Sequence, residues 1–236
     1  LFRSGAELYK ATGESSYLTQ AKDYALKSSN ADSWTVRDSA AHYQLYPFIN
    51  LGHFSLHEVV DQEFKKTLEN FYQEGIEYTL KKAQNSPFEV GIPFIWCSNN
   101  LMTSLATQLI LYEKMSGNTQ YQPYLIAQRD WLFGKNPWGT SMFTGIPKHG
   151  DFPVYVHTAP YVKLGLEIPG GLVDGPIFRT IHSNLIGLTL ERPDDYVGRQ
   201  NPFIVYHDAV GDYSTNEPTM DGTAGSILMM AYFSRK

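Results

Sequence analysis

Residues 58–80 read Glu-Val-Val-Asp-Gln-Glu-Phe-Lys-Lys-Thr-Leu-Glu-Asn-Phe-Tyr-Gln-Glu-Gly-Ile-Glu-Tyr-Thr-Leu. Apolar side chains recur along this stretch at Val60, Phe64, Leu68, Phe71 and Tyr78. That spacing is the helical period, and charged residues occupy the other side. The stretch therefore predicts a long amphipathic helix with one buried face, and it indicates a helical fold.

The same signals predict further helices on both sides of this one. They fall at residues 1–11, 16–28, 43–54, 100–115, 121–133 and 218–233. Pro47 marks a start or a kink in the third segment along the chain. Ser98 and Asn99 are candidate N-caps for the helix over 100–115, and Gly117 is a candidate C-cap. Short turns between helices of similar length indicate antiparallel helix hairpins.

Residues 134–217 have a different texture, rich in Gly, Pro and aromatic residues. Helical periodicity is weak there, except over 181–190. A long irregular region inside a compact chain is uncommon and is usually functional. We therefore predict a mainly α-helical fold whose functional loops lie in the second half of the chain.

Composition bounds the possible functions. The 236 residues are 42% hydrophobic, which fits a folded chain with a sizeable core. A net charge of −5 and the lack of a basic run argue against a nucleic-acid partner. The single cysteine, Cys97, excludes an intrachain disulfide, and no apolar run reaches membrane-spanning length. The chain opens inside a helical pattern, as we expect of a fragment or a processed product.

Aromatic residues make up 14% of the chain. They could fill the core, or they could form a cleft in which rings stack on the apolar faces of sugars. Composition leaves both interpretations open.

Glu217 is the candidate proton donor. We expect Pro218 in the first turn of the last helix, which puts Glu217 at or next to its N-cap. The helix dipole favours a charged carboxylate there, whereas a general acid must hold its proton. A neighbouring carboxylate such as Asp208, Asp212 or Asp221 could supply that effect. A capping role and a catalytic role both remain open from position alone.

Other chemistries find less support in the sequence. His149 and His157 lie on Gly/Pro-rich loops, where a histidine could bind sugar hydroxyls or serve structure. No closely spaced histidine pair occurs, so we expect no transition-metal site. Cys97 sits among apolar residues, which favours an inert buried thiol. Nucleophile-elbow and phosphate-loop motifs are absent from the sequence. Gly170, Gly171 and Gly175 instead indicate tight turns near Asp174.

Five segments together carry a family resemblance. In chain order they are 91–100 (Gly-Ile-Pro-Phe-Ile-Trp-Cys-Ser-Asn-Asn), 134–145 (Gly-Lys-Asn-Pro-Trp-Gly-Thr-Ser-Met-Phe-Thr-Gly), the segment around His157, 170–176 (Gly-Gly-Leu-Val-Asp-Gly-Pro) and 212–217 (Asp-Tyr-Ser-Thr-Asn-Glu). With these motifs in this order, the chain resembles glycoside hydrolase family 9, the inverting cellulases and related β-glucanases. The resemblance covers most of the chain and is strongest from residue 91 onward.

The resemblance implies an all-α (α/α)6 barrel, incomplete in this chain, with long irregular loops that form a cleft. Glu217 then corresponds to the general acid that protonates the glycosidic oxygen, and His157 to a histidine that contacts sugar beside the cleavage point. Trp138, Asp212 and Tyr213 lie in matching motifs and take cleft or supporting roles. The implied partner is a β-glucan, the implied location is secreted or periplasmic, and no cofactor or metal is implied.

Two segments of the chain depart from the family pattern, and the family's catalytic base is not found in this chain. Thr158 and Ala159 follow His157 where the family has a His-His-Arg cluster, and Val210 and Gly211 stand where an Arg commonly precedes the Asp-Tyr pair. The family's catalytic base is an aspartate of an Asp-rich motif near the start of the domain. An inverting enzyme needs both carboxyl groups, about 6.5–9.5 Å apart. We therefore expect residues 1–236 to be the C-terminal portion of one such domain, with its N-terminal portion as partner.

Two alternatives of other kinds remain. A non-catalytic glycan-binding protein would keep an aromatic cleft without cleaving its ligand. A helical barrel could also carry out other sugar chemistry, such as epimerisation or cleavage of uronic-acid polymers. Analysis of the products separates each of these from hydrolysis.

Overall fold

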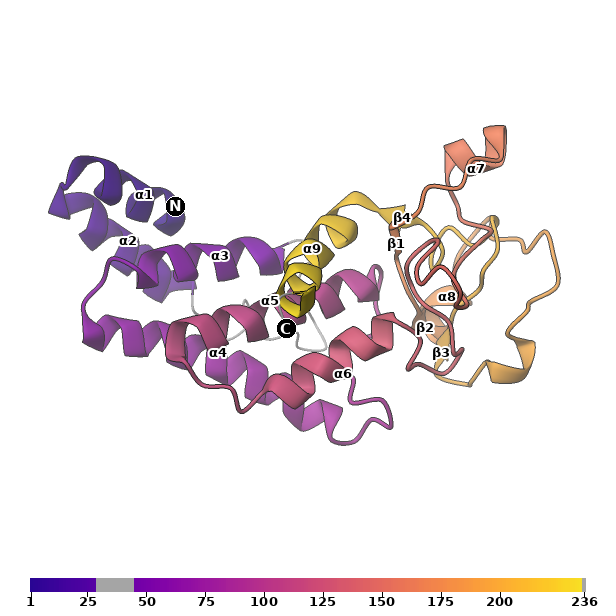
Figure 1. Ribbon diagram of the computed structural model, residues 1–236, viewed down its shortest axis with the longest axis horizontal. Helices are drawn as coiled ribbons and strands as arrows, with labels where there is room; N and C mark the ends of the chain where they lie inside the picture. Colours follow the sequence, from indigo (N-terminus) through magenta and orange to yellow (C-terminus); the bar gives the residue numbers. More distant parts are fainter. Residues whose placement is uncertain (29–44, 235–236) are drawn as a thin grey trace.

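A computed structural model describes residues 1–28 and 45–234, and most of its regular structure is helical (Figure 1). The helices of the described residues are α1 (Phe2–Thr12), α2 (Ser15–Ser28), α3 (Leu45–His57), α4 (Gln62–Ala83), α5 (Ser98–Ser116), α6 (Gln122–Leu132), α7 (Ala159–Leu164), α8 (Arg179–His182) and α9 (Met220–Ser234). A 3₁₀ turn, η1 (Val197–Arg199), and four two-residue strands complete them. The predicted helical class is confirmed.

Helix α4 forms where the amphipathic stretch predicts it, although it begins later. The Asp61 carboxylate accepts a hydrogen bond from the Phe64 backbone N–H at 2.9 Å, which caps the first turn. Lys81 and Lys82 lie in the last turn, where positive charge complements the helix dipole. Leu68 is fully buried on the inner face.

Helix α5 is the centre of the scaffold. It packs against α3, α4, α6 and α9, and every residue from 98 to 112 is buried. The sequence indicates one apolar stripe on this helix, but neighbouring helices cover all of its sides. A helix enclosed in this way fixes the positions of the elements around it.

The predicted caps of α5 are partly wrong. The N-cap is Cys97, in the left-handed region at φ 56°. Ser98 and Asn99 instead reach across to the loops. The Ser98 hydroxyl donates to the Pro176 carbonyl at 2.6 Å, and the Asn99 amide donates to the Val173 carbonyl at 2.8 Å. The C-cap prediction is confirmed, because Gly117 has φ 70° and donates to the Glu113 carbonyl.

Two apolar clusters stabilise the described residues. The larger one joins α4, α5, α6 and α9 to the loops and includes Trp131 and Trp138. The smaller one lies where α1 and α2 meet α3 and α4, and it contains small residues such as Ala6, Ala21 and Ala25. Figure 1 shows the helices in the left and middle of the molecule and the short strands, with α7 and α8, gathered at its right.

Residues 133–219, here named the loop region, hold the strands. Strand β1 (Leu172–Val173) pairs antiparallel with β4 (Pro218–Thr219). Strand β2 (Ile177–Phe178) pairs antiparallel with β3 (Ile204–Val205). The predicted irregular texture is confirmed.

One predicted helix and one segment with helical periodicity need correction. Over 181–190 the helix extends only to His182, the end of α8, and Gly187 adopts φ 78°. The last helix begins at Met220 and not at Pro218, because Pro218 and Thr219 are taken up by the β1–β4 pair. For the helix predicted over 43–54, residues 43–44 lie outside the described residues, and α3 includes the remainder. No helix among residues 1–28 and 45–234 combines the length and apolarity needed to cross a bilayer.

Candidate functional site

The β1–β4 pair brings two carboxylates together at the end of the loop region. Continuing its register from Val173 and Pro218 places Asp174 opposite Glu217, and the Asp174 N–H donates to the Glu217 carbonyl at 2.9 Å. Directly opposed residues of an antiparallel pair point to the same face. The sequence places Asp174 near a predicted turn and in the motif at 170–176, and the pairing brings it beside the candidate acid.

The two carboxylates differ in exposure. Glu217 is exposed, whereas Asp174 is 3% exposed. Burial, together with the negative charge of Glu217, raises the pKa of Asp174 to about 7, against the opposing hydrogen bond from the Cys97 thiol. That thiol lies 3.1 Å from the Asp174 carboxylate. The apolar surroundings predicted for Cys97 are therefore wrong: its thiol is buried, but beside a carboxyl group.

Glu217 is not a helix cap. Because Pro218 lies in β4, the glutamate stands before a strand, and α9 begins beyond it. The residue before it is fixed: the Asn216 amide donates to the Tyr155 carbonyl and to Asp208, both at 2.9 Å, and accepts from the Tyr206 hydroxyl at 3.0 Å. The backbone that carries Glu217 is thus held firmly while its side chain faces outward.

Asp208 joins two segments of the loop region. Its carboxylate accepts hydrogen bonds from the backbone N–H groups of Val154 and Tyr155, at 2.9 and 2.8 Å, and from the Asn216 amide. Burial raises its pKa, and these bonds oppose that shift. Such a fully bonded carboxylate serves to hold the chain, and it has little capacity left to activate a water molecule.

Asp212 is bonded still more completely. One oxygen, Oδ1, accepts from Ser214 N–H at 3.0 Å, Ser214 Oγ at 2.6 Å and Thr215 N–H at 3.2 Å. The other, Oδ2, lies 3.3 Å from His182 Nε2 and 2.7 Å from His207 Nδ1. Burial works against the charged form, yet the bonds from the two histidines and Ser214 hold the pKa of Asp212 below its ordinary value. Asp212 has no exposed surface, and its bonds to Ser214 and Thr215 hold the turn that carries Tyr213.

His157 is oriented by its backbone neighbours. Its Nδ1 lies 2.6 Å from the Val210 carbonyl, which can only accept, so we assign the ring proton to Nδ1. The ring meets Tyr213 edge-on at 6.2 Å. In the neutral ring this assignment leaves Nε2 as an acceptor for a hydroxyl group.

Tyr213 belongs to an aromatic pair. Its ring stacks on Trp96, with centroids 6.1 Å apart and planes at 21°, and its hydroxyl donates to the Ile186 carbonyl at 2.9 Å. Trp96 is 37% exposed. The motif at 91–100 contained this tryptophan, but nothing in one sequence told an exposed ring from the many buried ones.

Trp138 lies elsewhere. It is fully buried, with Trp131 and Tyr206 edge-on to its ring at 6.4 and 5.5 Å. Its indole N–H reaches Gln200 at 3.3 Å. The resemblance gives Trp138 either a cleft role or a supporting role. Because the ring has no exposed surface in this chain, only the supporting role fits.

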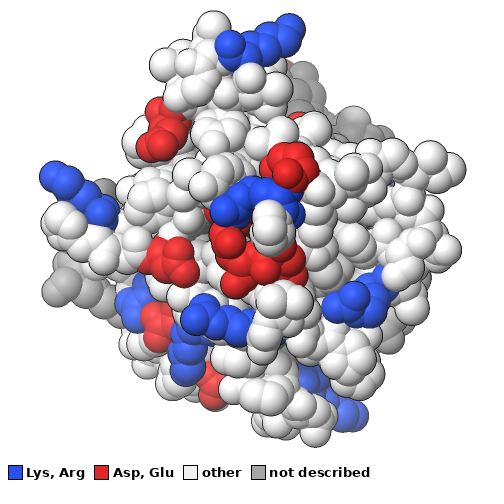
Figure 2. Space-filling model, turned by 90° about the vertical axis from the view of Figure 1, so that its right-hand side faces the viewer, with Lys and Arg blue, Asp and Glu red and all other residues white. Residues whose placement is uncertain are grey.

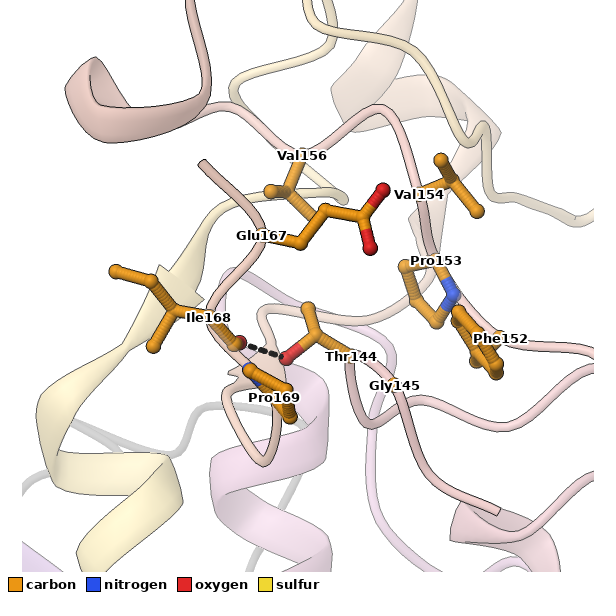
Figure 3. Close-up of a pocket in the computed structure, with 9 residues that line it drawn as sticks. All are labelled: Thr144, Gly145, Phe152, Pro153, Val154, Val156, Glu167, Ile168 and Pro169. Atoms are coloured by element: carbon orange, nitrogen blue, oxygen red, sulfur yellow. Dashed lines mark hydrogen bonds between the residues drawn. The ribbon is translucent and has the colours of Figure 1, made fainter. Parts of the chain in front are cut away.

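The surface of the loop region is mixed in charge. Figure 2 shows this end of the molecule, with acidic side chains gathered near the centre and Lys or Arg side chains directly beside them. A separate small hollow of about 20 Å³ lies between Thr144 and Pro169, walled mainly by apolar residues. Figure 3 shows the Glu167 carboxylate extending across it toward Val154, and the Thr144 hydroxyl bonded to the Ile168 carbonyl.

The sequence profile described as "Glycosyl hydrolase family 9" matches residues 1–230. The chain belongs to glycosyl hydrolase family 9. The resemblance carried by the five ordered motifs is therefore confirmed. No curated protein matches the sequence.

Solved structures of this family share the fold. The family 9 endoglucanase J30 superposes with a TM-score of 0.71 at 23% identity, over 98% of this chain and 41% of that one. AaCel9A in complex with cellobiose-like isofagomine gives 0.70 at 20%, over 98% and 42%. A family 9 protein of Bacteroides ovatus gives 0.68 at 19%, over 97% and 38%. This chain thus matches part of the (α/α)6 barrel domains of family 9.

Proposed function

We propose that this chain supplies the general-acid half of an inverting β-1,4-glucan hydrolase, with Glu217 as the acid. The observation that carries the proposal is the placement of Glu217: an exposed carboxyl group on a backbone fixed at Asn216, opposite a second carboxyl group. Family membership supports the reaction type. The relatives named as an endoglucanase and as a complex with a cellobiose-like compound support the substrate class.

Glu217 would protonate the glycosidic oxygen as the bond to the leaving sugar breaks. A general acid must hold its proton at the working pH. Asp174 lies opposite Glu217, and burial together with the negative charge of Glu217 raises the pKa of Asp174. A protonated Asp174 adds no negative charge beside the proposed acid.

Sugar binding would fall to the rings and to His157. Trp96 presents an exposed face beside Tyr213, a surface suited to the apolar face of a pyranose. The Nε2 atom of His157 is available to accept a hydrogen bond from a sugar hydroxyl.

We place the catalytic base in another part of the domain. The carboxylate oxygens of Asp208 and Asp212 already accept the hydrogen bonds that hold the loops. The chain spans 41% of the length of J30. The N-terminal portion of the same domain is therefore the proposed partner and the source of the base. Because a polymeric glucan lies outside the cell, the proposed location is secreted or periplasmic.

The test is Glu217→Gln in the complete protein, with Glu74→Gln on the exposed face of α4 as the matched control. Loss of the acid should lower kcat on β-1,4-glucan by about 10²–10⁴-fold and leave thermal unfolding unchanged. Oligosaccharides with a 2,4-dinitrophenyl leaving group, which departs without protonation, should lose much less activity. Near-normal glucan turnover by the variant would refute the assignment. A complete protein that binds glucan without cleaving it would establish the binding-protein alternative.

A further inference from the structure

Three side chains with metal-ligating atoms meet in the loop region. The atoms are His182 Nε2, His207 Nδ1 and Asp212 Oδ2, and all lie within 4.8 Å of one another. The three residues come from the end of α8, from the segment after β3 and from the turn before Tyr213. Because the ligands lie on separate segments, no short histidine spacing in the sequence could reveal them.

Two of the three separations are close to those around a small metal ion, and the third is at most 4.8 Å. Zinc takes imidazole nitrogen and carboxylate oxygen at about 2.0–2.2 Å in a tetrahedron, which sets ligand atoms about 3.3 Å apart. Asp212 Oδ2 lies 3.3 Å from His182 Nε2 and 2.7 Å from His207 Nδ1. Small side-chain shifts would thus form the site. We propose that His182, His207 and Asp212 bind a divalent transition-metal ion of the zinc type, which ties three segments of the loop region together.

The surroundings orient these ligands. Ser214 and Thr215 hold Asp212 Oδ1, which leaves Oδ2 directed at the two rings. Asp194 Oδ2 lies 3.9 Å from His207 Nε2. When the metal takes Nδ1 of the neutral ring, the ring proton moves to Nε2, where Asp194 is the neighbouring acceptor. Metal-bound histidines commonly have such a carboxylate behind them.

An ion could also reach this position. The side chains of His182 and His207 are 17% and 10% exposed, and Asp212 is fully buried. The site therefore opens on the side of the histidines, where water can take the fourth position. Two nitrogen ligands disfavour calcium and magnesium, which prefer oxygen. This inference concerns structure and does not depend on the proposed hydrolysis.

The experiment titrates chelator-treated protein with Zn²⁺ by calorimetry and follows thermal unfolding in parallel. We expect one ion per chain with Kd tighter than about 100 μM. At 100 times Kd, we expect a rise in Tm of about 5–11 °C. Mg²⁺ should give neither effect. His182→Gln should weaken binding at least about 100-fold, whereas His149→Gln, an exposed histidine elsewhere in the loop region, should not change it.

His182→Gln is the chosen variant because it leaves the bond between His207 and Asp212 in place. If His182→Gln does not fold, the visible spectrum of Co²⁺ added to the wild-type protein tests the site instead. A site with two imidazole ligands and one carboxylate gives visible absorption bands that free aqueous Co²⁺ does not. Weaker Zn²⁺ binding than stated, binding unchanged in folded His182→Gln, or an aqueous Co²⁺ spectrum would overturn the proposal.

Discussion

Helix α5 and the turn at residues 208–217 are both buried, but different groups surround them. Helix α5 packs through apolar side chains such as Leu101 and Leu105, which have no exposed surface. Its first turn also hydrogen-bonds to the loop region through Ser98 and Asn99. In the turn, the buried groups include the carboxylates of Asp208 and Asp212, each hydrogen-bonded to backbone N–H groups. Apolar packing tolerates changes of pH, whereas buried carboxylates depend on their charge and partners. Loss of apolar contacts should therefore destabilise the scaffold at any pH, whereas a change in the charge or the hydrogen bonds of the buried carboxylates should destabilise the loop region.

The largest effect is expected in the scaffold. Leu105→Ala removes a fully buried side chain from the main cluster, which should lower the free energy of unfolding by about 3–5 kcal/mol. Denaturant unfolding measures this, and the loss should be independent of pH. Leu8→Ala on α1, at a site 44% exposed, should cost less than about 1 kcal/mol. Equal losses from the two variants would break the contrast between core and surface.

A pH-dependent effect is expected at Asp174. Its pKa is about 7 in the folded chain and near 3.8 when unfolded. Between those values the folded state binds more protons, so the free energy of unfolding should fall as pH rises from about 4 to about 7. Asp174→Asn, uncharged throughout, should remove a fall of about 3–4 kcal/mol. Denaturant unfolding at several pH values checks this, with exposed Glu14→Gln as control. An unchanged slope in Asp174→Asn would show that Asp174 does not retain its proton.

The smallest effect is expected at the aromatic pair and rests on the proposed function. Trp96→Ala should weaken binding of a cello-oligosaccharide to the complete protein by about 3–10-fold. Tyr24→Ala on α2 is the control, because Tyr24 is 37% exposed, as Trp96 is. Calorimetry gives both affinities. Unchanged affinity in Trp96→Ala would remove this pair from the substrate site.

The scaffold was largely predictable because its signals are local. The spacing of Phe64, Leu68 and Phe71 set α4, and Gly117 set the end of α5. The errors arose where pairing with a segment distant in the sequence overrides the local helix signal. Pro218 belongs to a helix start by its local sequence, but pairing with Val173 draws it into a strand.

The site was predictable only as far as the motifs extend. Glu217 and His157 were candidates from their positions, and the resemblance gave each a role, which stays a prediction until activity is measured. The contacts of Asp174, His182 and His207 come from segments that meet across the fold. Such contacts leave no spacing in the sequence, so a single sequence could not have shown that these residues meet their partners.

Buried carboxylates hold the loop that carries Glu217, independently of the apolar scaffold. Hydrogen exchange on Asp208→Ala measures whether they do. This variant leaves the N–H groups of Val154 and Tyr155 without their acceptor, a loss of about 1–3 kcal/mol. We expect exchange at these amides and across 207–217 to quicken at least about tenfold, with α5 unchanged. The control, exposed Asp23→Ala on α2, should leave both regions unchanged. Equal acceleration in α5, or none at Val154 and Tyr155, would contradict the account.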